Sequence, residues 1–399
     1  MSEHSHALTP PVAETFQSRS AGSLPTILLG VGAVGIIGSL IGAVIAPQQF
    51  AFSWLFAFFY FFTLCAGALF WTILHHATDS EWSVLVRRQL ENIASLLPWF
   101  AILFIPLLIA PELLWKWWDR DISADALLYA KKGYLNHGFF YIRAIAFFVL
   151  LGGTAFLLRK ISIAQDRDGK GIHSLRMRKI AIIGLPAFAV SLTFAAVDWL
   201  MALDHHWFST MWGVYIFAGA AGSSMSLLVL IVTALRDRGY LKPVNMEHYH
   251  IMGKYMLAFV IFWAYIGYSQ YMLIWYSNIP EETIYFRIRN TESWWYFSTF
   301  LVVFRFFLPF PVLLLQWTKK NPRYICWVAW LILFVQAVDI YVIVLPALHD
   351  LGFRPSILDP LAFVGIGGIL GWLFLRVIGK SNLFPTRDPR LAGSIKLTN

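Results

Sequence analysis

The stretch FAFSWLFAFFYFFTLCAGALFWTILH, residues 50–75, contains no aspartate, glutamate, lysine or arginine. An α-helix rises about 1.5 Å per residue, so a run of this length can cross the roughly 30 Å apolar core of a bilayer. A strand of a membrane barrel needs only about 10 residues, so the run is far too long for that class of protein. The stretch therefore predicts a membrane-spanning helix.

Similar apolar runs occupy most of the chain, in which 58% of residues are hydrophobic and only 13% are charged. Soluble domains carry about 25% charged residues. These features predict an all-α integral membrane protein with about ten transmembrane helices in one domain, residues 24–378. A mobile tail is expected at 1–23, without the pattern of a cleaved signal peptide, and a second tail at 379–399. The ten predicted spans are 24–45, 50–75, 94–115, 138–158, 179–200, 211–235, 248–276, 293–317, 323–346 and 357–378.

Basic residues favour one orientation of these spans. Three of the 31 lysine and arginine residues lie well inside spans, and seven lie in the segments opposite the N-terminus, which leaves 21 on the side of the two termini. The positive-inside rule places that richer side, which includes Arg87 and Arg88, in the cytoplasm. The net charge of +9 is thus mainly a topology signal that also attracts lipid headgroups. Because the charge is spread over every inner segment, no nucleic-acid partner is expected.

The positions of the histidines and cysteines show which redox cofactors this chain could bind. Cys65 and Cys326 are the only cysteines, too few for a cysteine-ligated iron–sulfur cluster and without a C-x-x-C-H haem attachment. All eleven histidines fall in tails, loops or span ends, whereas a haem held in mid-membrane needs ligands inside the spans. We therefore expect no catalytic residue and no redox centre in this chain.

The stretch DWLMALDHHWFST, residues 198–210, places Asp198, Asp204, His205 and His206 where the fifth span ends. Adjacent histidines on a helix point about 100° apart and rarely share one ion, so no metal site is expected. The simplest interpretation is a polar cap at headgroup level, with the neighbouring tryptophans in an aromatic belt. These tryptophans are Trp199, Trp207 and Trp212.

Charged residues inside the predicted spans are few: Arg143, Asp198, Lys254, Arg305 and Asp339. A charge near the helix centre costs about 2.5–3.5 kcal/mol on insertion scales, so each needs a partner, water or a function. We expect Asp198 or Asp339 to pair with Arg143 or Arg305. The functional alternative is a proton or quinol pocket that opens to the outside. Asp198 and His205 would share a face of the fifth helix if that helix continued so far.

The seventh span carries a polar stripe within an arc of about 100°. The stripe could carry protons, although such groups more often form hydrogen bonds between helices. It consists of Lys254, Tyr265, Tyr268, Ser269 and Tyr276. After this span, Glu281 and Glu282 lie in an outer loop that could meet Asp204, His205 and His206 of the preceding outer loop at one surface. The candidates for a docking surface are His206, Trp207, Glu281 and Glu282. That surface could exchange protons or dock an external subunit.

The segments DWLMALDHHWFSTMWGVYIFAGA (198–220) and FWAYIGYSQYMLIWYSNIPEETIYF (262–286) resemble ActF, the second large polytopic subunit family of alternative complex III. The resemblance implies two four-helix bundles in a bacterial inner membrane and a complex that oxidises quinol. Its partners would be an NrfD-like polytopic subunit, multihaem cytochromes and an iron–sulfur subunit, which hold the haems and clusters. This chain would contribute structure, docking and possible proton translocation.

Two other functions remain open. A secondary transporter would show interrupted helices around a midplane site, and no such pair is evident in the sequence. A quinol-binding subunit in its own right would need hydrogen-bond donors beside an aromatic cleft, which Asp198, His205 and the nearby tryptophans could supply.

Overall fold

The computed structural model describes residues 13–398, and ten helical segments within them are long and apolar enough to cross a membrane. Two of the ten spans are built from consecutive pieces. The segments are α1 (Leu24–Ile45), α2 (Pro47–Ala77), α3 (Val84–Ala94) with α4 (Trp99–Ile109), α6 (His137–Asp168), α7 (Ile172–Trp199), α8 (Trp212–Asp237), α9 (Met246–Ser277), α11 (Trp294–Val302) with η5 (Val303–Phe307) and α12 (Pro309–Leu314), α14 (Pro322–Val344) and α15 (Leu358–Ile378).

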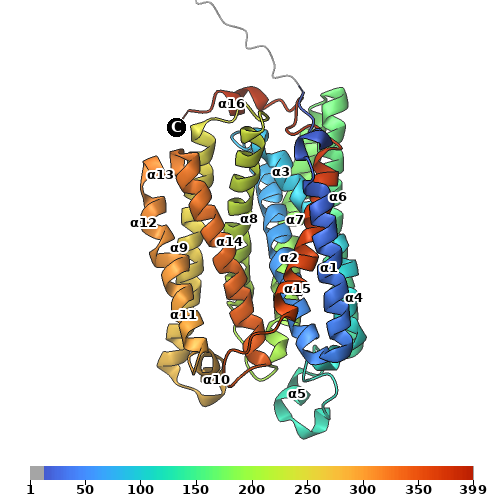
Figure 1. The fold of residues 1–399 in the computed structure, drawn as a ribbon, viewed down its shortest axis with the longest axis vertical. Coiled ribbons are helices and arrows are strands. Elements are labelled where there is room, and N and C mark those ends of the chain that lie inside the picture. Colours follow the sequence, from blue (N-terminus) through green and yellow to red (C-terminus); the bar gives the residue numbers. More distant parts are fainter. Residues whose placement is uncertain (1–12, 399) are drawn as a thin grey trace, which may run out of the picture.

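Shorter helices lie at the two ends of these spans (Figure 1). The end that carries the C-terminus is called the terminal end, and the other is called the opposite end. The terminal end carries η1 (Ser18–Ala21), α13 (Gln316–Lys320) and α16 (Leu391–Ile395), and the opposite end carries η2 (Pro111–Leu113), η3 (Ile122–Ala124), α5 (Ala126–Lys131), η4 (Met201–Leu203), α10 (Pro280–Arg289) and η6 (Leu345–Ala347).

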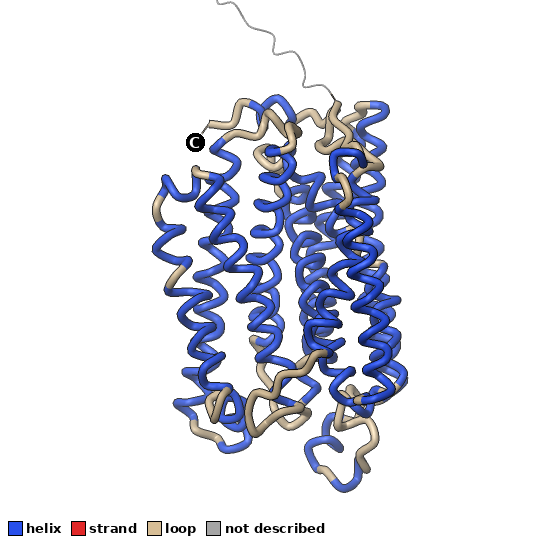
Figure 2. The backbone as a smooth tube through the Cα atoms, viewed as in Figure 1, coloured by secondary structure: helices blue, strands red, loops and turns tan. Residues whose placement is uncertain are grey.

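Helix contacts divide eight of the spans into two four-helix bundles. The first contains α2, α3–α4, α6 and α7, and the second contains α8, α9, α11–α12 and α14. The bundles meet mainly where α2 packs against α8, while α1 and α15 pack together and against α2. Figure 2 shows most of the loops at the two ends of the molecule. The predicted all-α class with about ten spans is confirmed.

The centre of the fold is an aromatic core around α2 and the end of α7. Trp199 is fully buried and packs against Phe58, Phe62 and Phe104. Trp207 and Trp212, at 2% and 3% exposure, are buried as well. The predicted aromatic belt is therefore wrong for these three tryptophans, because neighbouring helices and loops cover them.

Four spans differ clearly from their predicted form. The fourth, α6, extends ten residues past its predicted end at 158, and the fifth, α7, begins seven residues before its predicted start at 179. The third begins at Val84, ten residues before the predicted start, so Arg87 and Arg88 lie inside a helix. The eighth is interrupted, because a π-helical turn joins α11 to α12 just before Pro309. Proline lacks the N–H that an α-helix needs, and π-helical turns occur frequently at functional sites.

The described parts of the two predicted tails pack against the terminal end. Residues 1–12 of the N-terminal tail lie outside the described residues. In the part that follows, Phe16 is buried, Glu14 accepts a hydrogen bond from the Leu241 N–H, and the Leu383 N–H donates to the Glu14 carbonyl. The C-terminal segment crosses the terminal end of the bundles and finishes in α16 (Figure 1).

Glycine allows α1 and α15 to approach at backbone distance. A Cβ atom added at Gly35 would lie 2.5 Å from the Cα and N atoms of Gly365. A Cβ added at Gly368 would lie 2.7 Å from the Gly32 backbone. Small residues commonly mediate such helix contacts in membranes, where van der Waals packing drives helix association.

We predict that Gly35→Val displaces α1 from α15 and lowers the melting temperature of the detergent-solubilised protein by several degrees, because overpacking costs about 1–3 kcal/mol. Gly30→Val is the matched control on the same helix, since a Cβ at Gly30 meets nothing within 4 Å. Scanning fluorimetry of both variants measures the effect, and equal melting temperatures would contradict the proposed close approach.

Candidate functional site

An Arg–Asp ion pair lies inside the second bundle. Arg305, on η5 near the middle of its span, places Nη1 3.1 Å from Oδ2 of Asp339 on α14. Both residues are only 3% exposed. Tyr215 on α8 donates its hydroxyl to Asp339 Oδ1 at 2.6 Å, and Trp263 on α9 donates its indole N–H to Oδ2 at 3.2 Å. The carboxylate is thus contacted from all three other helices of the bundle.

The Arg305 guanidinium is confined by further contacts. It lies over the Trp263 ring, 4.4 Å from the centroid, and donates from Nη2 to Gln336 Oε1. A Cβ at Gly219 would stand 2.9 Å from Nη2 and 2.8 Å from the Gln336 oxygen, so glycine makes the space for this contact. The π-helical turn that carries Arg305 therefore delivers a cation into a fully packed polar site.

The first bundle holds a second pair in a corresponding place. Arg143 on α6 donates from Nε and Nη2 to the two Asp198 oxygens at 2.6 and 3.0 Å, and from Nη1 to the Tyr134 carbonyl. In each bundle the arginine belongs to the third helix and the aspartate to the fourth. Of the pairings that the sequence left open, the structure has Arg143 with Asp198 and Arg305 with Asp339. Helix α7 ends at Trp199, so it does not continue to His205 and the two residues do not share a helix face.

At the opposite end, two loops bring Asp125, His205 and His206 together. The Nε2 atoms of both histidines lie 3.0 Å from Asp125 Oδ2, and the two imidazole centroids are 4.1 Å apart. The hydrogen bond from His205 and a backbone bond from the Leu128 N–H hold the pKa of Asp125 well below its usual range. Burial lowers the pKa of His205, against the opposing effect of Asp125, which favours a neutral imidazole at pH 7. Asp125 was missed in the sequence because it lies 80 residues from His205.

A half-open pocket of about 240 Å³ lies beside these histidines, between the bundles. Trp207 and Tyr285 stack in its wall with ring centroids 4.0 Å apart, and the Arg289 guanidinium lies over the Tyr285 ring, 3.5 Å from its centroid. Burial raises the pKa of Tyr285 to about 12. The loop after α7 and helix α10 thus meet, as the sequence suggested. Trp207, however, is a buried wall residue, so its prediction as part of a docking surface is wrong.

The remaining sequence candidates lie on the surface. In the predicted stripe, Tyr265, Tyr268 and Tyr276 are 64%, 65% and 84% exposed on α9, and Lys254 is exposed as well. Ser269 donates to the Tyr265 carbonyl of its own helix. The stripe therefore provides no proton path through the interior of the bundle. Glu281 and Glu282 stand in the first turn of α10, with Glu281 exposed, and Asp204 and His206 are partly exposed nearby.

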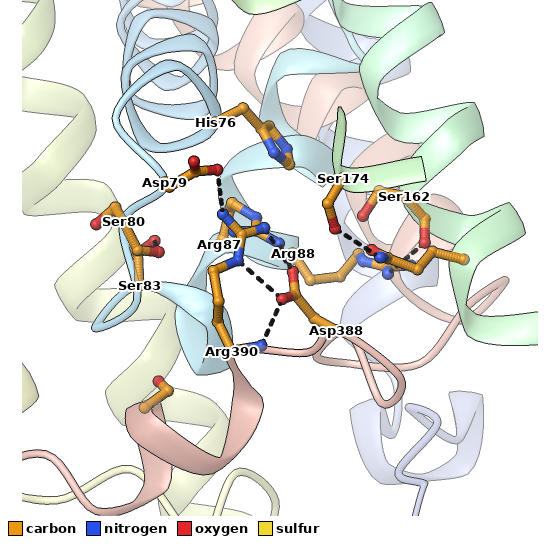
Figure 3. Close-up of polar contacts among 12 residues, drawn as sticks. His76, Asp79, Ser80, Ser83, Arg87, Arg88, Ser162, Ser174, Asp388 and Arg390 are labelled. Atoms are coloured by element: carbon orange, nitrogen blue, oxygen red, sulfur yellow. Dashed lines mark hydrogen bonds and ion pairs between the residues drawn. The ribbon is translucent and has the colours of Figure 1, made fainter. Parts of the chain in front are cut away.

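The terminal end contains a buried charged cluster that the sequence analysis missed. Arg87 and Arg88 are fully buried on α3, and both pair with Glu91 one turn later, at 3.5 and 3.1 Å. Arg88 also contacts Asp166 of α6 at 2.9 Å. Arg87 contacts Asp388 of the C-terminal segment at 2.7 Å, and Figure 3 shows these two side chains next to each other. The Arg87, Arg88 and Glu91 spacing was a usable signal, since residues three and four apart share a helix face. Asp388 had none.

Several buried polar atoms in this cluster have no hydrogen-bond partner. They include both ring nitrogens of His75 and His76, and Nη1 of Arg87 and of Arg88. Buried polar groups in proteins are normally satisfied, by ordered water where side chains do not reach. Ordered water would satisfy these atoms.

A third polar site missed in the sequence lies where α15 begins. Asp359 accepts hydrogen bonds from Ser53 at 2.5 Å, from Gln49 at 3.1 Å and from Tyr341 at 2.9 Å. It stands two residues inside the predicted tenth span, and the sequence analysis did not single it out. Its partners come from α2 and α14, so the site fastens α15 to both bundles.

No protein-family model matches the chain, and a comparison with curated proteins also finds no match. The structure and the composition establish a multi-pass membrane protein with ten spans among the described residues.

We predict that Asp339→Asn is strongly destabilising, by about 3–5 kcal/mol, because it leaves the buried Arg305 charge uncompensated. Thermal unfolding in detergent measures the loss. The double variant Arg305→Met/Asp339→Leu removes both charges and should recover much of it. If Asp339→Asn were as stable as the exposed control Asp119→Asn, the Arg305–Asp339 ion pair would not be formed in the folded protein.

A second prediction concerns acid stability. Burial alone would raise the pKa of Asp388, but hydrogen bonds from Arg390 and the charges of Arg87 and Arg390 outweigh it and hold the pKa below its usual range. The folded-state pKa is thus lower than the unfolded value of about 3.9, so Asp388 stabilises the fold above that value and loses this effect as pH falls through the folded pKa.

Melting temperatures measured from about pH 6 to pH 3 should therefore fall less steeply for Asp388→Asn than for the wild type, from a lower starting value. Asp119→Asn controls for removal of an exposed carboxylate. Parallel slopes for the wild type and Asp388→Asn would contradict the assignment.

Proposed function

We propose that this chain is a membrane subunit of a quinol-oxidising electron-transfer complex of the alternative complex III type, in a bacterial cytoplasmic membrane. Haem-bearing and iron–sulfur partners carry the electrons, and this chain moves protons and docks its neighbours. The resemblance of segments 198–220 and 262–286 and the two four-helix bundles support this proposal.

The proton role rests on one observation: the Asp339 carboxylate is buried in an apolar bundle with a tyrosine hydroxyl and a guanidinium as direct partners. Intramembrane carboxylates of this kind commonly mark proton relays. Tyr215 joins Asp339 to the stacked Trp212, which lines the pocket at the opposite end. Protons exchange with the predicted outer side by this route, through Tyr215 and the pocket.

The buried cluster around Glu91 supplies the second end of the pathway, on the predicted cytoplasmic side. Between the two sites, α8 carries the fully buried hydroxyls of Ser223, Ser224 and Ser226, each of which donates to a carbonyl of its own helix. Each hydroxyl keeps acceptor capacity, and the proposed path relies on water molecules between the helices to connect the sites. Proton transfer through such a chain needs no redox group in this subunit.

The test uses membrane vesicles that contain the whole complex, driven by a quinol and an electron acceptor. Tyr215→Phe removes only the hydroxyl that bonds Asp339, and we predict a proton flux lower by about 100-fold with electron transfer retained. Tyr265→Phe is the matched control, because its hydroxyl lies on the exposed face of α9. An unchanged proton-to-electron ratio in Tyr215→Phe would refute the proton role.

Capture of the tagged chain from mildly solubilised membranes tests the complex itself. Co-purifying multihaem and iron–sulfur proteins, detected by difference spectra and peptide identification, support it. A colourless chain without partners would refute it.

One observation favours a secondary transporter as the second candidate. The eighth span is interrupted at the π-helical turn that carries Arg305, and transporters use interrupted helices to form midplane sites. Solute uptake by the reconstituted chain alone, lost in Arg305→Lys, would establish that function instead.

Quinol binding at Asp198 is less favoured, because Arg143 occupies both of its carboxylate oxygens.

A further inference from the structure

The side chains of Asp125, His205 and His206 present three metal-binding atoms to one point at the opposite end of the molecule. All three atoms lie within 4.8 Å of one another, and each histidine Nε2 is 3.0 Å from Asp125 Oδ2. In a tetrahedral site with bonds of about 2.0 Å, ligand atoms stand roughly 3.3 Å apart. The two separations between the carboxylate oxygen and the histidine nitrogens, 3.0 Å each, are close to that spacing.

The local backbone explains how adjacent histidines converge. The expectation of no metal site assumed that His205 and His206 are in a helix, where they would point apart. Helix α7 instead ends at Trp199, η4 ends at Leu203, and both histidines stand in an irregular loop. There the two rings lie side by side in a tilted arrangement, with centroids 4.1 Å apart and an interplanar angle of 39°.

The carboxylate is fixed in its orientation before any ion binds. Asp125 Oδ1 caps α5 by accepting hydrogen bonds from the N–H groups of Leu127 and Leu128, at 3.0 and 3.1 Å. Oδ2 is left to face the histidines. Hydrogen bonds of this kind to the ligating residues orient metal sites.

The remaining charges around the cluster are compatible with a cation. Asp204 Oδ1 lies 3.9 Å from Nδ1 of His206 and places a negative charge behind that ring. Arg120 lies 3.5 Å from Asp125 Oδ2, but its side chain is half exposed and free to turn into solvent. Lys131 is engaged with the His205 carbonyl at 2.6 Å and not with a ligand atom.

We propose that Asp125, His205 and His206 bind one divalent transition-metal ion of the zinc class. Two imidazoles and one carboxylate are a donor set that Zn²⁺ accepts, and water completes the tetrahedron. The ion cross-links the loop before α5 to the loop after α7, which are 80 residues apart in sequence. It thereby fixes one wall of the pocket that His205 and His206 line. This inference does not depend on the proposed function.

The test uses the full chain, with its co-purifying partners, after chelator treatment. Titration with Co²⁺ should give one equivalent per chain with the intense visible absorption of four-coordinate cobalt, displaced by Zn²⁺. His206→Ala and Asp125→Asn should each weaken binding by at least about tenfold. His206 is partly exposed, and asparagine caps helices as well as aspartate does, so both variants should keep the fold.

His173→Ala is the matched control, because His173 forms a similar contact with Asp168, at 3.0 Å, at the terminal end. Melting curves recorded without metal verify that each variant is folded. Absence of cobalt absorption in the wild type would overturn the proposal. Equal binding by His206→Ala, His173→Ala and the wild type would overturn it as well.

Discussion

A charged group inside an apolar helix bundle is expensive unless a partner of opposite charge and further hydrogen bonds compensate it. The Arg305–Asp339 pair shows how the fold satisfies this constraint. One aspartate receives an arginine, a tyrosine hydroxyl and an indole N–H from three different helices. Because every helix of the second bundle contributes, the register of all four is set by this one site.

Buried arginines are paired with carboxylates at two further places in the fold. Arg143 and Asp198 hold the ends of α6 and α7 together in the first bundle. At the terminal end, Arg87, Arg88 and Glu91 draw in Asp166 from α6 and Asp388 from the C-terminal segment. The segment after α15 thus belongs to the folded unit, because its aspartate neutralises a buried arginine.

The sites proposed for function lie where regular helix structure is interrupted. Arg305 stands on a π-helical turn, and His205 and His206 stand in the loop that follows the end of α7. Regular helices keep their backbone groups paired and their side chains diverging, so convergent polar groups arise more readily at breaks. The pocket at the opposite end is lined by these two histidines, next to Tyr285 and Trp207.

The sequence alone determined the class of the protein, because a run such as 50–75 has only one stable environment, and it located most span ends to within a few residues. It also identified Arg143, Asp198, Arg305 and Asp339, since a charge in an apolar run is visible without coordinates. Which arginine meets which aspartate depends on helix packing. Asp125 and Asp388 became partners only in the tertiary structure, because they stand in loops where no periodicity marks them and their contacts join segments up to 301 residues apart.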